Sequence, residues 1–280
     1  MSYPASMRAS APVAVLRTIF LAVFTVWSLF PIYWIVSMSF KSPVDTLSIP
    51  PKWFFLPTLN AYHEAFTQAP LGALLINSLT IAATATAISL AVGVLAGYSL
   101  TLLRLQRAKN YEFWVLSSRM APPVAVAIPF FLVYRDTHLL DTILGMVLVH
   151  IVVVIGVVTW ILVETFAGLP RELAEAALVD GCSHLGAFRH IMAPLAVPGV
   201  VGAGVISFLL SWNEFFFALI LTSDKAKTAP VGLFDYIGFQ AINLNALAAA
   251  ASILLIPAAV TVVGFQKFLV RGLTMGAVKG

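Results

Sequence analysis

The sequence predicts an all-α protein that crosses a membrane several times. Hydrophobic residues make up 60% of the chain and charged residues only 10%, and the mean hydropathy is +0.97. Charged residues make up about a quarter of an ordinary soluble domain. Uncharged runs of about 20 residues recur along the chain, and this is the length that a helix needs to cross a bilayer core of about 30 Å. These observations exclude a soluble globular domain and favour a polytopic membrane protein with six transmembrane helices.

The expected spans are separated by prolines, polar turns and charged residues. We expect short cytoplasmic tails at 1–12 and 272–280 and a transmembrane domain over 13–271 that includes a long loop at 167–197. The six spans are expected at about 18–40, 71–103, 111–134, 142–163, 198–221 and 246–265.

The first two spans are uncharged throughout. The first lies between Arg17 and Lys41. Signal peptides have a shorter apolar region and a small-residue cleavage site, so we expect this helix to be retained. The second span is longer than one crossing requires, which predicts a tilted helix. Within it, Gly93 and Gly97 form a notch of small residues that another helix can approach closely.

The later spans carry prolines and few charges. The third is interrupted by Pro122-Pro123 and by Pro129, and because proline lacks a backbone N–H this helix should be kinked. The fourth is uncharged until Glu164 ends it. The fifth begins near Pro198, and the sixth is broken by Pro257.

The loop between the fourth and fifth spans differs from the hydrophobic runs around it. The stretch after Pro170 is rich in alanine and leucine, which predicts a helix of about two to three turns. Gly181 follows as the expected left-handed end of that helix. Ser183 is placed to cap a second short helix through His190, with its junction to the next span at Pro194. Small alanines with interspersed carboxylates suit a helix that fits a groove in a partner protein, although an ordinary interfacial helix remains an alternative.

This loop resembles the EAA loop of the permease subunits of ATP-binding-cassette importers. The family pattern is EAA, three residues, Gly, nine residues and I-x-L-P, and the spacing matches throughout. Ala193 stands where the family usually has Leu, which should weaken one packing contact. The resemblance implies a type I ABC importer permease fold in which this loop docks on the ATPase subunit. The residues to which it implies a coupling role are Glu175, Ala176, Ala177, Asp180, Gly181, Ile191 and Pro194.

Polar side chains inside the spans are the second group of candidate residues. Residues 204, 207, 211, 214 and 218 share one helical face of the fifth span. Trp212-Asn213-Glu214 followed by phenylalanines resembles the W-N-E/D-F element of carbohydrate-importer permeases. Polar groups at membrane depth either line a solute pathway or join neighbouring helices, and both interpretations stay open. The candidate pathway residues are Asn77, Arg119, Ser211, Trp212, Asn213 and Glu214.

The distribution of lysine and arginine predicts the topology. With six spans, both termini and the loop at 167–197 lie on one side. That side holds ten of these residues and the opposite side five, and the remaining one, Arg119, lies in a span. The positive-inside rule therefore predicts that both termini and this loop are cytoplasmic. The resemblance implies that the membrane is the inner membrane of a bacterium.

Several chemistries find no support in the sequence. It contains no GxxxxGK[ST] phosphate loop, no HExxH metal motif and no GxSxG elbow. The net charge of +4 comes from loops that flank lipid, so it gives no case for nucleic-acid binding. We expect no enzyme activity, no metal and no cofactor. The histidines lack plausible metal spacing: they are His63, His138, His150, His184 and His190.

The resemblance covers residues 18–280 and implies the permease subunit of a binding-protein-dependent sugar importer that forms half of the translocation pathway. The implied partners are a second homologous permease subunit, two ATP-binding cassette subunits, an extracytoplasmic solute-binding protein, a sugar and the lipid bilayer. Two alternatives remain. A secondary transporter would use Glu214 or Arg119 to couple an ion gradient, and a membrane scaffold would have no transport activity.

Overall fold

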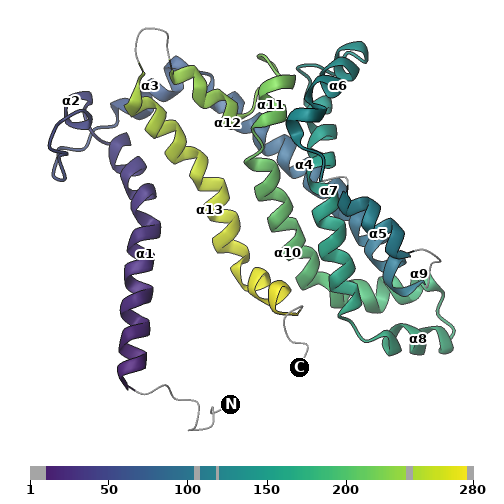
Figure 1. The fold of residues 1–280 in the computed structure, drawn as a ribbon. Helices are drawn as coiled ribbons and strands as arrows, with labels where there is room; N and C mark the ends of the chain where they lie inside the picture. Colours follow the sequence, from purple (N-terminus) through teal and green to yellow (C-terminus); the bar gives the residue numbers. More distant parts are fainter. Residues whose placement is uncertain (1–10, 104–107, 118–119, 238–241, 276–280) are drawn as a thin grey trace. The chain divides into compact units, whose positions relative to one another are not determined.

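The structure is a computed structural model that describes residues 11–103, 108–117, 120–237 and 242–275 (Figure 1). Arg119 therefore lies outside the described residues. The chain divides into two compact units, one formed by residues 1–69 and 235–253 and the other by residues 70–234 and 254–280. Within the described residues, five helical stretches are long and apolar enough to cross a membrane: Val13–Ser39, Leu71–Leu102, Ile143–Ala167, His184–Trp212 and Leu244–Phe268.

The first unit is organised around the end of its long N-terminal helix. The Asn245 amide donates hydrogen bonds to the carbonyls of Met38 and Lys41, at 3.0 and 2.9 Å. The Lys41 ammonium lies over the rings of Trp34 and Phe55, an arrangement that stabilises a poorly solvated cation. The helices of this unit are α1 (Ala11–Ser39), α2 (Pro43–Thr46), α3 (Asn60–Gln68) and the start of α13 (Leu244–Met275).

The second unit is built on three long helices that pack together, α4 (Leu71–Leu102), α7 (Ile143–Ala167) and α10 (Ala193–Trp212). The predicted notch of small residues on α4 is confirmed. A Cβ on Gly97 would lie 2.9 Å from the backbone carbon of Leu162 in α7, and one on Gly93 would lie 2.8 Å from Val158. Only glycine therefore lets α4 and α7 approach this closely.

Short helices lie at the two ends of this three-helix core (Figure 1). At one end, α7 leads into α8 (Arg171–Val179), α9 (His184–Ala187) and a π-helical turn, η2 (Phe188–Met192), which continues into α10. The other short elements of the unit are α5 (Ala108–Ser117), α6 (Pro123–Asp136), α11 (Phe216–Leu221), α12 (Ala229–Gly232) and the start of η3 (Leu233–Tyr236).

Three expected helices differ in the structure. The third span, expected as one kinked helix over 111–134, is divided into α5 and α6, and α6 begins at the Pro122-Pro123 pair. The fifth, expected as one helix over 198–221, ends at Trp212 and resumes as α11. The short helix expected to end near His190 instead runs without interruption into α10. Pro194 lies two residues after the π-helical turn η2, and such a turn locally changes the hydrogen-bond pattern of a helix.

Candidate functional site

The helix α8 turns two of its alanines toward the core and its carboxylates outward. Ala174 and Ala177 are buried, whereas Glu172, Glu175 and Ala176 are exposed. Alanines at a spacing of three share one helical face, and their size lets the α8 backbone lie close to its neighbours. The surrounding apolar cluster contains Tyr98, Phe166, Ala174, Met192 and Ala196. Residues from α4, α7 and α10 therefore hold α8.

The end of α8 has the hydrogen-bond pattern of a Schellman motif. Gly181 has φ +88°, its N–H donates to the Leu178 carbonyl at 3.1 Å, and the Cys182 N–H donates to the Ala177 carbonyl at 2.9 Å. This left-handed backbone suits glycine because a side chain there would be strained. The prediction that Gly181 ends this helix is confirmed. The Ser183 hydroxyl likewise accepts the Gly186 N–H at 3.1 Å and caps α9 as expected.

Tyr98 of α4 fastens this loop to the core. Its hydroxyl donates to the His184 carbonyl at 3.1 Å. Its ring centroid lies 5.9 Å from that of Phe166 in α7 and 4.9 Å from that of Phe188 in η2. One side chain thus contacts α7, α9 and η2. A force applied to α8 or α9 would therefore reach α4 and α7 directly.

The predicted coupling residues divide between the two faces of this loop. Ala177 is buried, and Ile191 packs against the apolar cluster around Tyr98. The other face of the loop carries two exposed apolar side chains that sequence reasoning passed over, Val179 at 87% and Leu185 at 70% exposure. The sequence feature that could have identified these two side chains is their position close to the EAA pattern. The remaining predicted residues are exposed: Glu175, Ala176, Asp180, Gly181 and Pro194.

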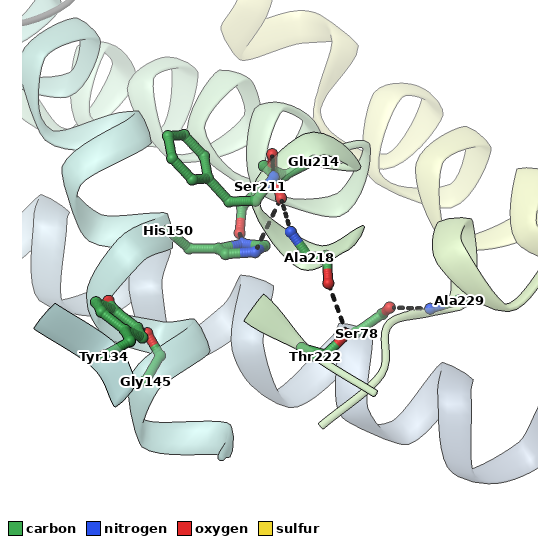
Figure 2. Close-up of polar contacts among 10 residues, drawn as sticks. Ser78, Tyr134, Gly145, His150, Ser211, Glu214, Ala218, Thr222 and Ala229 are labelled. Atoms are coloured by element: carbon green, nitrogen blue, oxygen red, sulfur yellow. Dashed lines mark hydrogen bonds and ion pairs between the residues drawn. The ribbon is translucent and has the colours of Figure 1, made fainter. Parts of the chain in front are cut away.

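A second candidate site lies where α7 meets the end of α10, and it combines three polar side chains (Figure 2). The imidazole Nδ1 of His150 lies 2.6 Å from the Ser211 hydroxyl, and its Nε2 lies 3.6 Å from Oε2 of Glu214. His150 is 1% exposed, and the Glu214 side chain is 8% exposed. Sequence reasoning placed Ser211 and Glu214 on one face but missed His150, whose signal was an imidazole in an otherwise apolar span.

Glu214 explains why the fifth span is interrupted. Its two carboxylate oxygens accept the N–H groups of Phe217 at 2.8 Å and Ala218 at 3.1 Å, in the first turn of α11. Figure 2 shows the bond to Ala218. A side chain that caps the following residues competes with continuation of its own helix. The α10 helix therefore ends at Trp212, and Glu214 starts a separate helix.

The other candidate pathway residues do not join this cluster. The Trp212 indole donates to the Leu254 carbonyl of α13 at 3.2 Å. The Asn213 amide is exposed and donates to the Leu209 carbonyl at 2.8 Å. Asn77 of α4 donates to the carbonyls of Lys225 and Lys227, at 2.9 and 3.0 Å, and so holds the loop before α12.

That loop is also held by Asp141, which sequence reasoning did not single out. The Asp141 carboxylate accepts the backbone N–H groups of residues 223–226 at 3.0–3.3 Å, and the Ser223 hydroxyl at 3.1 Å. Burial opposes ionisation of this carboxyl, but the backbone donors outweigh it and lower the pKa of Asp141 to about 2. The Ser78 hydroxyl accepts the Ala229 N–H at 2.8 Å. The loop at 222–229 is thus tied to both α4 and the start of α7.

A cavity of about 170 Å³ lies between α6, α7 and α11, and its lining is apolar. Phe130 and Phe217 line it, with ring centroids 5.5 Å apart. No group of three or more His, Cys, Asp or Glu side chains in the described part of the chain is arranged to hold a metal ion.

Comparison with known proteins gives consistent results. The family described as "binding-protein-dependent transport system inner membrane component" matches residues 89–275. The sulfoquinovosyl glycerol transport system permease protein SmoH of Agrobacterium fabrum is 36% identical, over 95% of this chain and 94% of its own length. The trehalose transport system permease protein SugB of Mycobacterium tuberculosis is 33% identical, over 91% and 93%.

Solved structures share the fold, and one of them is a chain in the crystal structure of a bacterial ABC transporter involved in the import of the acidic polysaccharide alginate. The TM-score is 0.73 at 23% identity, and the likeness covers 95% of this chain and 99% of the other.

Proposed function

The chain belongs to the family of binding-protein-dependent transport system inner membrane components, and from this premise we propose that it forms half of the translocation pathway of an ATP-driven sugar importer. It is a multi-pass inner-membrane permease subunit and a non-catalytic component. The family expected from the sequence is therefore confirmed. The secondary transporter is not favoured, because the relatives are ABC permeases that work with ATPase and binding-protein partners.

The sugar substrate is supported by the names of the relatives. SmoH is named for sulfoquinovosyl glycerol and SugB for trehalose, and both are similar to this chain over more than nine tenths of its length. Both compounds carry sugar rings linked through a glycosidic bond. We therefore propose a glycoside as the substrate. A second homologous permease subunit is part of the proposal, because one chain supplies only half of a pathway.

The coupling role of α8 is supported above all by its packing. Ala174 and Ala177 seat α8 on the apolar cluster around Tyr98, while Glu175, Ala176 and Asp180 face outward. The outward face is the surface to which we assign the ATPase subunit. When the ATPase subunits close, α8 would carry the ends of α4, α7 and α10 with it. The transmembrane helices would then tilt, and the translocation pathway would open to the outside of the cell.

The proposed orientation places the termini and α8 in the cytoplasm, where ATP is available. Its support is the excess of lysine and arginine on that side of the chain. On the opposite side, the loop at 222–229 is held by Asp141, Asn77 and Ser78. A loop held in this way suits docking of a binding protein, because little conformational entropy is lost on contact.

Reconstitution tests this function. The chain would be co-purified with its partner permease, ATPase subunits and binding protein, placed in proteoliposomes, and supplied with radiolabelled trehalose, maltose and glycosyl glycerol. We expect uptake of at least one of these sugars that requires ATP and the binding protein and persists when ionophores dissipate proton and sodium gradients. Uptake by this chain alone, or uptake abolished by the ionophores with ATP present, would refute the proposal.

A further inference from the structure

The helices α7 and α10 connect the coupling loop directly to the cluster of His150, Ser211 and Glu214. Residue 167 ends α7 only three residues before Pro170, the N-cap of α8, and α10 continues from η2. His150 lies 17 residues from that end of α7, or about 25 Å along the helix at about 1.5 Å per residue. The cluster is therefore placed to receive a displacement of α8 through two rigid helices.

Only one of the two ring nitrogens of His150 has a hydrogen-bond partner. Its Nδ1 pairs with the Ser211 hydroxyl at 2.6 Å, but its Nε2 has no hydrogen-bond partner although the atom is fully buried. The nearest carboxylate oxygen, Oε2 of Glu214, is 3.6 Å away, somewhat beyond the usual N–H···O range of about 2.7–3.2 Å. When the Ser211 hydroxyl donates to Nδ1, the imidazole proton is on Nε2, which is then a buried donor without a partner. A small shift that closes this gap is therefore favourable.

Movement of Glu214 would move α11. Both of its carboxylate oxygens hold N–H groups at the start of that helix, at Phe217 and Ala218. The backbone around residue 213 is not helical, so α11 can change its angle to α10 without breaking α10. Phe217 lies beside Phe130 of α6 at the apolar cavity. A change in α11 therefore reshapes the wall of that cavity.

We propose that His150 is a positioning residue that couples α8 to α11: a hydrogen bond from its Nε2–H to the Glu214 carboxylate forms in one state of the transport cycle and breaks in the other. This inference rests on the proposed function. The Ser211 contact keeps α7 and α10 together in both states. The bond to Glu214 sets the position of α11, and with it the cavity between α6 and α7.

Two substitutions separate the two contacts of His150. An asparagine amide can replace Nδ1 toward Ser211 but is too short to reach Glu214. A glutamine amide can reach the position of Nε2 and donate to Glu214. In the reconstituted complex we expect His150→Asn to lower the amount of sugar transported per ATP hydrolysed about tenfold, the effect of losing one hydrogen bond to a charged group. His150→Gln should stay within about twofold of the wild type.

The control is Val154→Ala, one helical turn away on α7 and fully buried. It removes packing atoms without touching the polar cluster, so it should lower the yield of the complex and leave the transport-to-hydrolysis ratio unchanged. A wild-type ratio in His150→Asn, or equal ratios in the two His150 variants, would overturn the proposal. Absence of uptake by the wild-type complex would instead count against the proposed function.

A measurement on the wild type covers the case in which the variants do not assemble. In a complex in which only this chain carries ¹⁵N-histidine, we expect the His150 Nε2 resonance to shift between the nucleotide-free and vanadate-trapped states, because its hydrogen bond is present in only one of them. The four other histidines are replaced one at a time to assign the signal. An Nε2 resonance at the same position in both states would overturn the proposal.

Discussion

Replacing Asp141 by asparagine should release the loop that joins α11 to α12. The Asp141 carboxylate accepts four backbone N–H groups, and its pKa is lowered from the ordinary 3.8 to about 2. A shift of this size corresponds to about 2.5 kcal/mol, which we reduce to about 1–2 kcal/mol because the group is partly exposed. Asparagine has one acceptor oxygen and no charge, so we expect most of this energy to be lost.

Hydrogen exchange of the amides of residues 223–226 measures this loss directly, because these are the groups that the carboxylate holds. We expect Asp141→Asn to speed their exchange about tenfold, which corresponds to about 1.4 kcal/mol. The matched control is Asp136→Asn, because Asp136 is an exposed carboxylate that pairs with Arg135 at the end of α6. Unchanged protection in Asp141→Asn, or equal loss in the control, would contradict the assignment.

The same clamp predicts a pH dependence. The folded pKa of Asp141 lies below its unfolded value, so the carboxylate contributes its full stabilisation above about pH 4 and loses it as the pH falls toward 2. Protection of residues 223–226, corrected for intrinsic exchange rates, should therefore fall across this interval in the wild type and stay flat in Asp141→Asn. A parallel fall in both proteins would show that another group is responsible.

Three further substitutions test the coupling loop and the core. Gly181→Leu forces a side chain into a left-handed backbone at a cost of about 1–2 kcal/mol, so it should reduce sugar uptake per ATP while the complex still assembles. The control is Gly72→Leu, at a glycine of α4 that has open space around it, and this variant should behave as wild type. Tyr98→Phe removes the hydroxyl that holds α9 and should lower the midpoint of thermal unfolding by an amount equivalent to about 1 kcal/mol. Equal midpoints would show that the ring contacts of Tyr98 hold α9 without the hydroxyl. Gly97→Val places a side chain against the backbone of Leu162 and should prevent recovery of folded protein from the membrane, so normal yield would mean that α4 and α7 pack differently.

The features that sequence reasoning predicted well depend on residues close together in the chain. Long apolar runs give the first, second, fourth and sixth helices, because the bilayer sets their composition and length. The end of α8 at Gly181 depends on a backbone preference of that one residue. The EAA spacing led to the correct family for the same reason, since the whole pattern lies within 20 residues.

The features that it missed depend on partners far apart in the chain. His150 was set aside as an unlikely metal ligand, and its partner Ser211 lies 61 residues away. Asp141 was not singled out, and the amides that it holds lie 82–85 residues away. Asn77 was a candidate pathway residue, but its amide is engaged by backbone carbonyls of the loop at 222–229. Side-chain type alone did not reveal these pairings.

Hydropathy and local backbone preference act over one or two turns of chain, so the sequence was enough to identify a helical membrane permease with a short, glycine-ended helix after Pro170. The tertiary structure alone decided where the fifth span breaks and which polar groups meet. Glu214 ends one helix and starts another only because its carboxylate reaches the N–H groups of α11 beside a buried imidazole from α7. At membrane depth no water is available to satisfy such groups, so their partners must come from neighbouring helices, and helix packing determines which partners they find.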